Sequence, residues 1–201
     1  FRNCATVGGS IYGRFGFSDV LSAFLALDSY VELTGAGRVP LAEFVDMGYV
    51  RDVIERVVVV KHDCRASYEA VRKAATDFPS LNVTAAWWDN SWHVTVGARP
   101  LRATLLQGEA CGLTNEQPSE DELRALAASV RALSYGTNLW GSAEYRRRIS
   151  APLAVQAVRR AAGIELSAAL ARELECVQIP KFATDEYSCR RVPGVDSSEV
   201  R

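Results

Sequence analysis

The stretch "LNVTAAWWDNSWHVTVGA", residues 81–98, predicts the structure of the middle of this chain. Two runs rich in β-branched and aromatic residues flank "DNS", residues 89–91, whose side chains favour a turn. This layout predicts a β-hairpin, and "LRATLL", residues 101–106, supplies a third strand. Three tryptophans surround the turn, and their alternation favours covering a core face over holding a ligand: Trp87, Trp88 and Trp92.

After the hairpin the hydrophobic period changes from that of strands to that of helices. Residues 118–134 place Ser119 and Glu122 at capping-box spacing, and an apolar stripe follows them. A second helix is predicted over residues 142–163. Pro152 lies inside it and is expected to kink the helix or to divide it in two.

The two ends of the chain complete the expected organisation. Residues 18–28 are predicted to form a short helix capped by a serine, and residues 29–35 and 52–61 are predicted to form strands. Residues 164–175 favour a further helix, whereas residues 176–201 have no periodicity and are expected to be poorly ordered. The order of elements indicates an α+β fold in two parts, divided near residue 50.

Composition and charge limit the classes of function. The chain has 201 residues, 48% of them hydrophobic, which is enough for one domain or two small ones. Its formal net charge is −1. Such a charge creates no global field that would attract nucleic acid or an anionic membrane. No apolar run approaches the about 20 residues of a membrane span, and the first residues lack a signal-peptide pattern, so a cytoplasmic location is expected.

Cysteine and histidine offer little material for a metal site. The five cysteines are scattered and never form a CxxC pair, which excludes a disulfide framework and the usual zinc or iron–sulfur motifs. With two histidines, His62 and His93, a histidine metal site or a Ser-His-Asp triad is not expected. Both histidines are expected to be structural or exposed.

The segment "ATVGGSIYGRFGFSD", residues 5–19, has two interpretations. Glycine backbone N–H groups can converge on a phosphate, because glycine takes positive φ without penalty and lets an anion approach closely. The segment is neither GxGxxG nor a P-loop, so a simple tight turn also accounts for it. Its surroundings favour the first interpretation.

Residues 1–45, "FRNCATVGGSIYGRFGFSDVLSAFLALDSYVELTGAGRVPLAEFV", resemble the FAD-binding (medium) subunit of the molybdenum hydroxylase family, which includes xanthine dehydrogenases, aldehyde oxidases and carbon monoxide dehydrogenase flavoproteins. That family has an R-N-x-A-T-[IV]-G-G-[NS] segment, a loop ending in Ser-Asp, a helix, a strand and "VPLxEF". The resemblance continues through "DVIERVVVV", "DFPSLNVTAA", "VGARPLRAT" and "GSAEYRRRI", and it covers residues 1 to about 162.

The resemblance implies a domain organisation. Residues 1–50 correspond to the C-terminal part of the FAD-binding domain. Residues 51–162 correspond to the flavoprotein C-terminal domain of the carbon monoxide dehydrogenase type, a three-stranded antiparallel sheet packed with a helical bundle. Residues 163–201 have no counterpart. The family's first FAD segment precedes everything in this chain, so Phe1 is expected to begin in mid-domain.

The resemblance also implies the cofactor site, and its residues are Thr6, Val7, Gly8, Gly9, Ser10, Asp19 and Ile54. The segment from Thr6 to Ser10 would lie against the FAD diphosphate, Asp19 would contact FAD from the same loop, and Ile54 would pack near the flavin ring. Each assignment has an alternative: the segment from Thr6 to Ser10 could form only a turn, Asp19 could be an acid placed favourably at a helix N-terminus, and Ile54 could be a core strand residue. A lysine of the family aligns near Glu69, with Arg72 and Lys73 close by, so its role is lost or moved.

In this family FAD receives electrons from [2Fe-2S] clusters after hydroxylation at a molybdenum centre, and usually passes them to NAD. The resemblance therefore implies an oxidoreductase component whose partners are a molybdenum-binding large subunit and a [2Fe-2S] small subunit. The alternative is a non-catalytic docking module that no longer binds flavin. A third hypothesis takes the arginines of residues 142–163 as a nucleic-acid element, although a solvated helix face also explains them.

Overall fold

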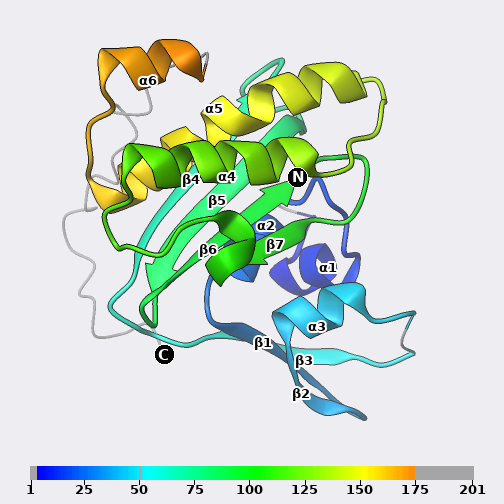
Figure 1. Ribbon diagram of the computed structural model, residues 1–201. Coiled ribbons are helices and arrows are strands. Elements are labelled where there is room, and N and C mark those ends of the chain that lie inside the picture. Colours follow the sequence, from blue (N-terminus) through cyan, green and yellow to red (C-terminus); the bar gives the residue numbers. More distant parts are fainter. Residues whose placement is uncertain (1–3, 50, 175–201) are drawn as a thin grey trace, which may run out of the picture.

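The computed structural model describes residues 4–49 and 51–174 and has an α+β fold (Figure 1). The first sheet has the strand order β2-β1-β3 and the second sheet β4-β5-β6-β7, and all pairings are antiparallel. The elements around the first sheet are α1 (Val7–Tyr12), α2 (Asp19–Leu25), β1 (Ser29–Leu33), β2 (Gly37–Pro40), α3 (Leu41–Asp46) and β3 (Ile54–Val59). Those around the second sheet are β4 (Arg65–Arg72), β5 (Pro79–Trp88), β6 (Ser91–Gly97), β7 (Thr104–Gln107), the 3₁₀ helix η1 (Gly108–Cys111), α4 (Glu120–Ala132), α5 (Ala143–Ala162) and α6 (Ala168–Glu173).

The predicted hairpin is confirmed as β5 and β6, with one difference at its turn. Ser91 pairs with Trp88, so the turn has two residues rather than three. Asp89 and Asn90 have φ values of 49° and 54°, the left-handed conformation of the tight turns that match strand twist. The sheet also gains a fourth strand, β4, which pairs with β5 along its length.

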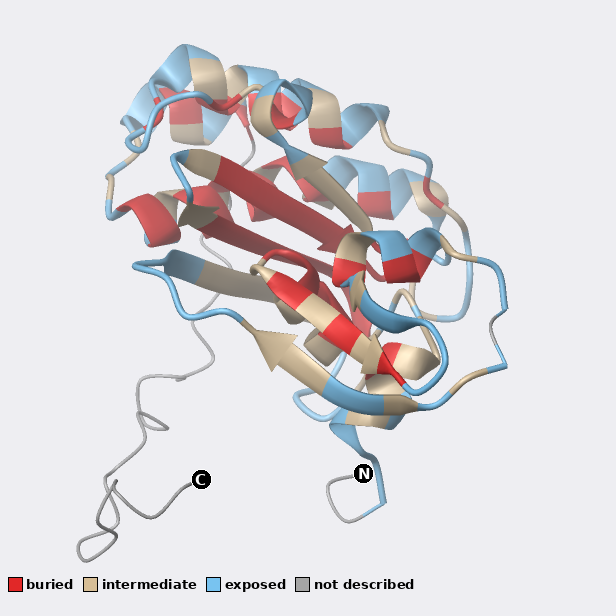
Figure 2. Cartoon of the chain, turned by 90° about the horizontal axis from the view of Figure 1, so that it is seen from below, coloured by how far each residue is buried: buried red, intermediate tan, exposed pale blue. Residues whose placement is uncertain are grey.

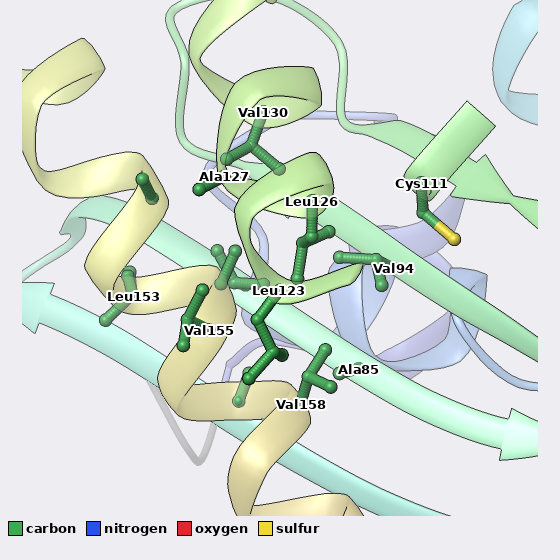
Figure 3. Close-up of a cluster of buried hydrophobic side chains, with 14 of the residues drawn as sticks. Ala85, Val94, Cys111, Leu123, Leu126, Ala127, Val130, Leu153, Val155 and Val158 are labelled. Carbon is green, nitrogen blue, oxygen red and sulfur yellow. The ribbon is translucent and has the colours of Figure 1, made fainter. Parts of the chain in front are cut away.

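The second sheet is covered on both faces. Helices α4 and α5 pack on one face, and α2 contacts β5 and β6. Because both faces are covered, eight successive residues of β5 from Pro79 are buried, as Figure 2 shows for the central strands. Figure 3 shows the core under the helices, where Leu123 and Leu126 of α4 and Val158 of α5 meet Ala85 and Val94 of the sheet.

The helices follow the sequence closely, with one correction. The capping box of α4 forms as predicted, with Ser119 and Glu122 bonded reciprocally. Helix α5 is not divided at Pro152 but runs through it for 20 residues. Proline removes one intrahelical bond, and burial of the neighbouring Leu153, Ala154 and Val155 against the sheet offsets that loss. Helix α6 confirms the predicted helix, and residues 175–201 lie outside the described residues.

The first sheet includes a strand that the sequence placed beyond the boundary near residue 50. Strand β3 pairs with β1, with Val57 opposite Val31, so it belongs to the first sheet. The division into domains otherwise stays a prediction. A separate cluster that includes Ile11, Leu21 and Phe44 packs beneath this sheet. No helix within the described ranges is long and apolar enough to cross a membrane.

Two glycines allow the parts of the chain to approach closely. A Cβ added to Gly97 would lie 2.3 Å from Ser22 Oγ and 2.2 Å from Asn82 Oδ1. A Cβ added to Gly16 would lie 1.9 Å from the Leu101 carbonyl oxygen. Beside Gly97, Ser22 Oγ donates to Asn82 Oδ1 at 3.0 Å, and this hydrogen bond joins α2 to the second sheet.

Candidate functional site

The glycine segment begins a helix rather than a turn. Thr6 is the N-cap of α1, and its Oγ1 accepts the Gly9 N–H at 3.0 Å. Gly8 and Gly9 lie within the helix and neither has positive φ, so the tight turn and the left-handed phosphate nest are both wrong as local conformations. What remains is a helix start, which leaves its first backbone N–H groups without intrahelical acceptors.

Gly8 has no packing reason to be glycine. A Cβ added there would meet nothing within 4 Å, whereas one added to Gly9 would meet Thr6 Oγ1 at 3.0 Å. Glycine inside a helix costs ~1 kcal/mol relative to alanine, so Gly8 weakens α1 without any gain in packing. The backbone at Gly8 is therefore open on this side, with no other group of the chain beside it.

Asp19 is held at the start of α2 by the second sheet. Arg72 Nη2 donates to its Oδ2 at 2.7 Å, and Tyr68 Oη donates to its Oδ1 at 2.5 Å. Asn82 Nδ2 adds a longer bond of 3.4 Å. Burial, followed by the bond to Asp19, raises the pKa of Tyr68 far above its ordinary value, so Tyr68 stays a donor. The Asp19 side chain is 45% exposed and retains access to solvent.

Ile54 opens β3, where it pairs with Leu33 and packs, half-buried, against the cluster beneath the first sheet. This is the contact expected of a core strand residue. Helix α1 also contacts β3, so the fold brings the strand of Ile54 beside the glycine segment. Asp19 follows α1 by one loop, and α1 and α2 are in contact.

The three positions expected near the lysine of the molybdenum hydroxylase family are Glu69, Arg72 and Lys73, and each has an ion-pair or hydrogen-bond partner within the chain. Glu69 Oε1 pairs with Arg160 Nη1 at 2.5 Å, and its side chain is 12% exposed. Burial raises the pKa of Glu69, and the Arg160 charge opposes that shift. Lys73 Nζ donates to the Leu139 carbonyl at 2.7 Å, while Arg72 is bonded to Asp19.

The arginines of α5 are not simply a solvated face. Arg146 is fully buried, and its guanidinium donates to the Ser80 and Gly136 carbonyls at 2.7 and 2.8 Å. Arg159 pairs with Glu165 at 2.9 Å, and Arg160 pairs with Glu69. The expectation of a solvated face is therefore wrong for Arg146. The nucleic-acid hypothesis also weakens, because these charges serve contacts within the chain.

The histidines have structural partners. His62 Nε2 lies 2.7 Å from Asp28 Oδ2, and the rings of His62 and His93 both stack on Trp88, at 5.5 and 4.0 Å. Trp88 Nε1 also donates to the Ala26 carbonyl, and Trp92 is fully buried. Within the described residues, no group of three or more His, Cys, Asp or Glu side chains could hold a metal ion.

The fold has counterparts among solved structures. A chain of carbon monoxide dehydrogenase from Hydrogenophaga pseudoflava, in a form that lacks the Mo-pyranopterin moiety, matches with a TM-score of 0.69 at 18% identity. Quinoline 2-oxidoreductase from Pseudomonas putida 86 and carbon monoxide dehydrogenase from Oligotropha carboxidovorans match with TM-scores of 0.66 and 0.67, at 16% and 17% identity. This chain has their fold.

The matches cover part of each protein. They span 80–82% of this chain but 61–63% of the three matched chains. No protein-family model and no curated protein sequence matches this chain. The likeness thus establishes the α+β architecture, with an antiparallel sheet packed against helices.

Proposed function

We propose that this chain is part of the FAD-binding medium subunit of a molybdenum hydroxylase. Its fold is that of chains from carbon monoxide dehydrogenase and quinoline 2-oxidoreductase, and the motifs of residues 1–45 follow the family order. The observation that carries the cofactor assignment is Gly8, where glycine costs helix stability and leaves open space beside the backbone. Backbone N–H groups at a helix start can bind the oxygen atoms of a diphosphate at close range.

Each proposed residue then has a physical task. The start of α1 directs the backbone N–H groups of Val7 and Gly8 toward the diphosphate, whereas the N–H groups of Gly9 and Ser10 donate to Thr6 within the chain. Asp19, fixed by Arg72 and Tyr68, accepts hydrogen bonds from hydroxyl groups of the ligand. Ile54 supplies an apolar surface near the flavin ring. When bound, FAD accepts electrons from [2Fe-2S] clusters and passes them on, usually to NAD.

The proposed partners are a [2Fe-2S] small subunit and a molybdenum-binding large subunit, which would carry substrate specificity. In such an assembly this chain binds and orients the cofactor, while the hydroxylation occurs elsewhere. A cytoplasmic location belongs to the same proposal.

Titration with FAD tests the cofactor assignment. Gly8→Val fills the open space beside α1 and is expected to weaken FAD binding at least tenfold, because the diphosphate can no longer reach the backbone. Gly48→Val is the matched control, since a Cβ at Gly48 also meets nothing within 4 Å but lies outside the proposed site. Equal flavin affinity in the two variants and the unchanged chain would contradict the assignment of Thr6–Ser10.

A second candidate function is a docking module that binds no flavin. It is favoured by Asp19, whose carboxylate oxygens are already bonded to Arg72, Tyr68 and Asn82. A folded chain that binds an iron–sulfur or molybdenum subunit, and remains colourless after incubation with excess FAD, would support this candidate over the first.

A further inference from the structure

A pocket of about 410 Å³ lies where four loops meet, and no proposed FAD residue lines it. The loops are the α1–α2, β4–β5, β6–β7 and α4–α5 connections. Its volume falls within the ~300–1,000 Å³ typical of small-molecule sites. The lining residues used below are Arg14, Phe15, Phe17, Phe78, Arg102 and Trp140.

Aromatic rings from three loops form one wall of the pocket. The rings of Phe15 and Phe17 stack at 5.2 Å, Phe17 and Phe78 lie 4.7 Å apart, and Phe78 meets Trp140 edge-on at 5.6 Å. Phe15 and Phe17 are 57% and 41% exposed, so large apolar rings face solvent here instead of the core. Such a wall favours a flat aromatic ligand, which gains ring contacts as well as apolar burial.

The charged residues of the lining are both cations. Arg14 Nη1 donates to the Met47 and Gly48 carbonyls at 2.5 and 2.9 Å, and Arg102 Nη1 donates to the Val45 carbonyl at 2.9 Å. These bonds hold both guanidiniums at the end of α3. Burial, and then the charge of Arg102, lower the pKa of Arg14, as expected for two like charges that lie near each other. A bound anion would relieve that repulsion.

The acid bonded to the aromatic wall is Asp77, and it is already engaged. Its Oδ1 accepts from Trp140 Nε1 at 3.0 Å and from the Phe78 N–H at 2.7 Å. Of the lining residues, only Arg14 and Arg102 carry a formal charge, so the lining combines positive charge with aromatic rings.

The backbone around the pocket is strained. Arg14 and Ala98, which both line it, have φ values of 49° and 57°, a conformation that non-glycine residues rarely adopt. Strained residues gather at binding sites, where the surrounding structure holds them in place. Here the close contact of Gly16 with Leu101 and the bond from Gly136 N to the Arg99 carbonyl fix the loops.

We propose that this pocket binds a flat aromatic group that carries a negative charge, such as an aromatic carboxylate. The rings of Phe17, Phe78 and Trp140 contact its faces and edges, and the guanidiniums of Arg14 and Arg102 attract the carboxylate. The proposal does not depend on flavin binding, because its residues differ from those assigned to FAD.

Calorimetric titration with 2-naphthoate tests the proposal, with 2-naphthylmethylammonium as a probe of the same ring and opposite charge. We expect saturable naphthoate binding and at least tenfold weaker binding of the cation. Phe17→Ala is expected to weaken naphthoate binding about tenfold through the lost ring contacts, and Phe17 is exposed enough for the chain to fold without its ring. Arg102→Gln should reduce the preference for the anion, and Arg102→Lys should retain part of it.

Leu139→Ala is the matched control, since Leu139 is 85% exposed beside Trp140 but does not line the pocket. Equal affinity for the two probes, no naphthoate binding, or an unchanged affinity in Phe17→Ala would overturn the proposal. Displacement of naphthoate by FAD would overturn the claim of a separate site. Gly8→Val separates the two assignments, because it should impair FAD binding and leave naphthoate binding unchanged.

Discussion

Replacement of Arg146 by methionine should be among the most damaging single changes in the α5 region. Arg146 is fully buried, and its guanidinium joins α5 to β5 and to the loop before α5. Methionine fills a similar volume but donates no hydrogen bond. The variant therefore isolates the polar contribution from the packing contribution.

The structure sets the size of the effect. The Ser80 carbonyl is buried and would lose its partner at Nε, which costs ~1–3 kcal/mol. The Gly136 and Gly141 carbonyls are partly buried, and each lost bond adds ~0.5–1.5 kcal/mol. The Asn138 side chain is exposed and adds little. A total of ~2–6 kcal/mol is expected, a large share of the ~5–15 kcal/mol that stabilises a typical domain.

Urea unfolding followed by circular dichroism measures this free energy. Arg131→Met is the control, because Arg131 lies at the exposed end of α4 and its replacement should change stability by less than ~0.5 kcal/mol. If Arg146→Met is too unstable to purify, Arg146→Lys keeps the charge without the fork of donors and should lose part of the same energy. A loss below ~1 kcal/mol in Arg146→Met would refute the accounting of its bonds.

Three further predictions follow from positions already described. Gly8→Ala should stabilise the chain by up to ~1 kcal/mol while weakening FAD binding, and thermal unfolding with flavin titration would reveal whether the two effects move in opposite directions. Gly97→Ala should destabilise by ~1–3 kcal/mol because its Cβ would collide with Ser22 and Asn82, whereas Gly48→Ala, measured in the same urea series, should change little. Burial raises the pKa of Glu122, but hydrogen bonds from Ser119, Thr114 and Asn115 outweigh burial and lower that pKa well below its ordinary value of 4.5. The ionised Glu122 side chain therefore stabilises the folded chain above pH 4.5, and this stabilisation is lost as the pH falls through the folded-state pKa. The stability difference between the unchanged chain and Glu122→Gln should therefore shrink between pH 7 and pH 3, and a constant difference would contradict this assignment.

The elements that the sequence predicted well are those whose signals are local. The hairpin of β5 and β6 has two apolar runs around turn residues, and α4 has its capping box within four residues. Strand β4 was not predicted because it is an edge strand, exposed or half-buried along its length, so its sequence shows no strong hydrophobic pattern. Helix α1 was not predicted because its two glycines disfavour a helix. In the folded chain, the burial of Ile11 offsets that unfavourable preference.

The candidate sites also differ in how far the sequence could predict them, because some of their residues are adjacent in sequence and others are brought together by the fold. The glycine segment could be found because its residues are adjacent in sequence, although its helical conformation could not. The partners of Asp19 could not be found, since Tyr68 and Arg72 lie on a strand about 50 positions away. The aromatic pocket draws its rings from three loops, and nothing in the sequence pairs Phe17 with Trp140. Such sites exist because of the fold rather than because of a motif.

The pairing of β3 with β1 governs where this chain can be cut for separate expression. Strand β1 lies between β2 and β3, so a fragment that ends at residue 50 would leave one side of β1 without hydrogen-bond partners. The same cut would uncover Val31 and the apolar cluster that Val57 helps to cover. An unpaired apolar strand edge templates association with other copies, so this fragment should aggregate. A cut between β3 and β4, after Val60 and before Arg65, keeps the strand pairings of both sheets but removes α2 from β5 and β6, so it uncovers one face of the second sheet.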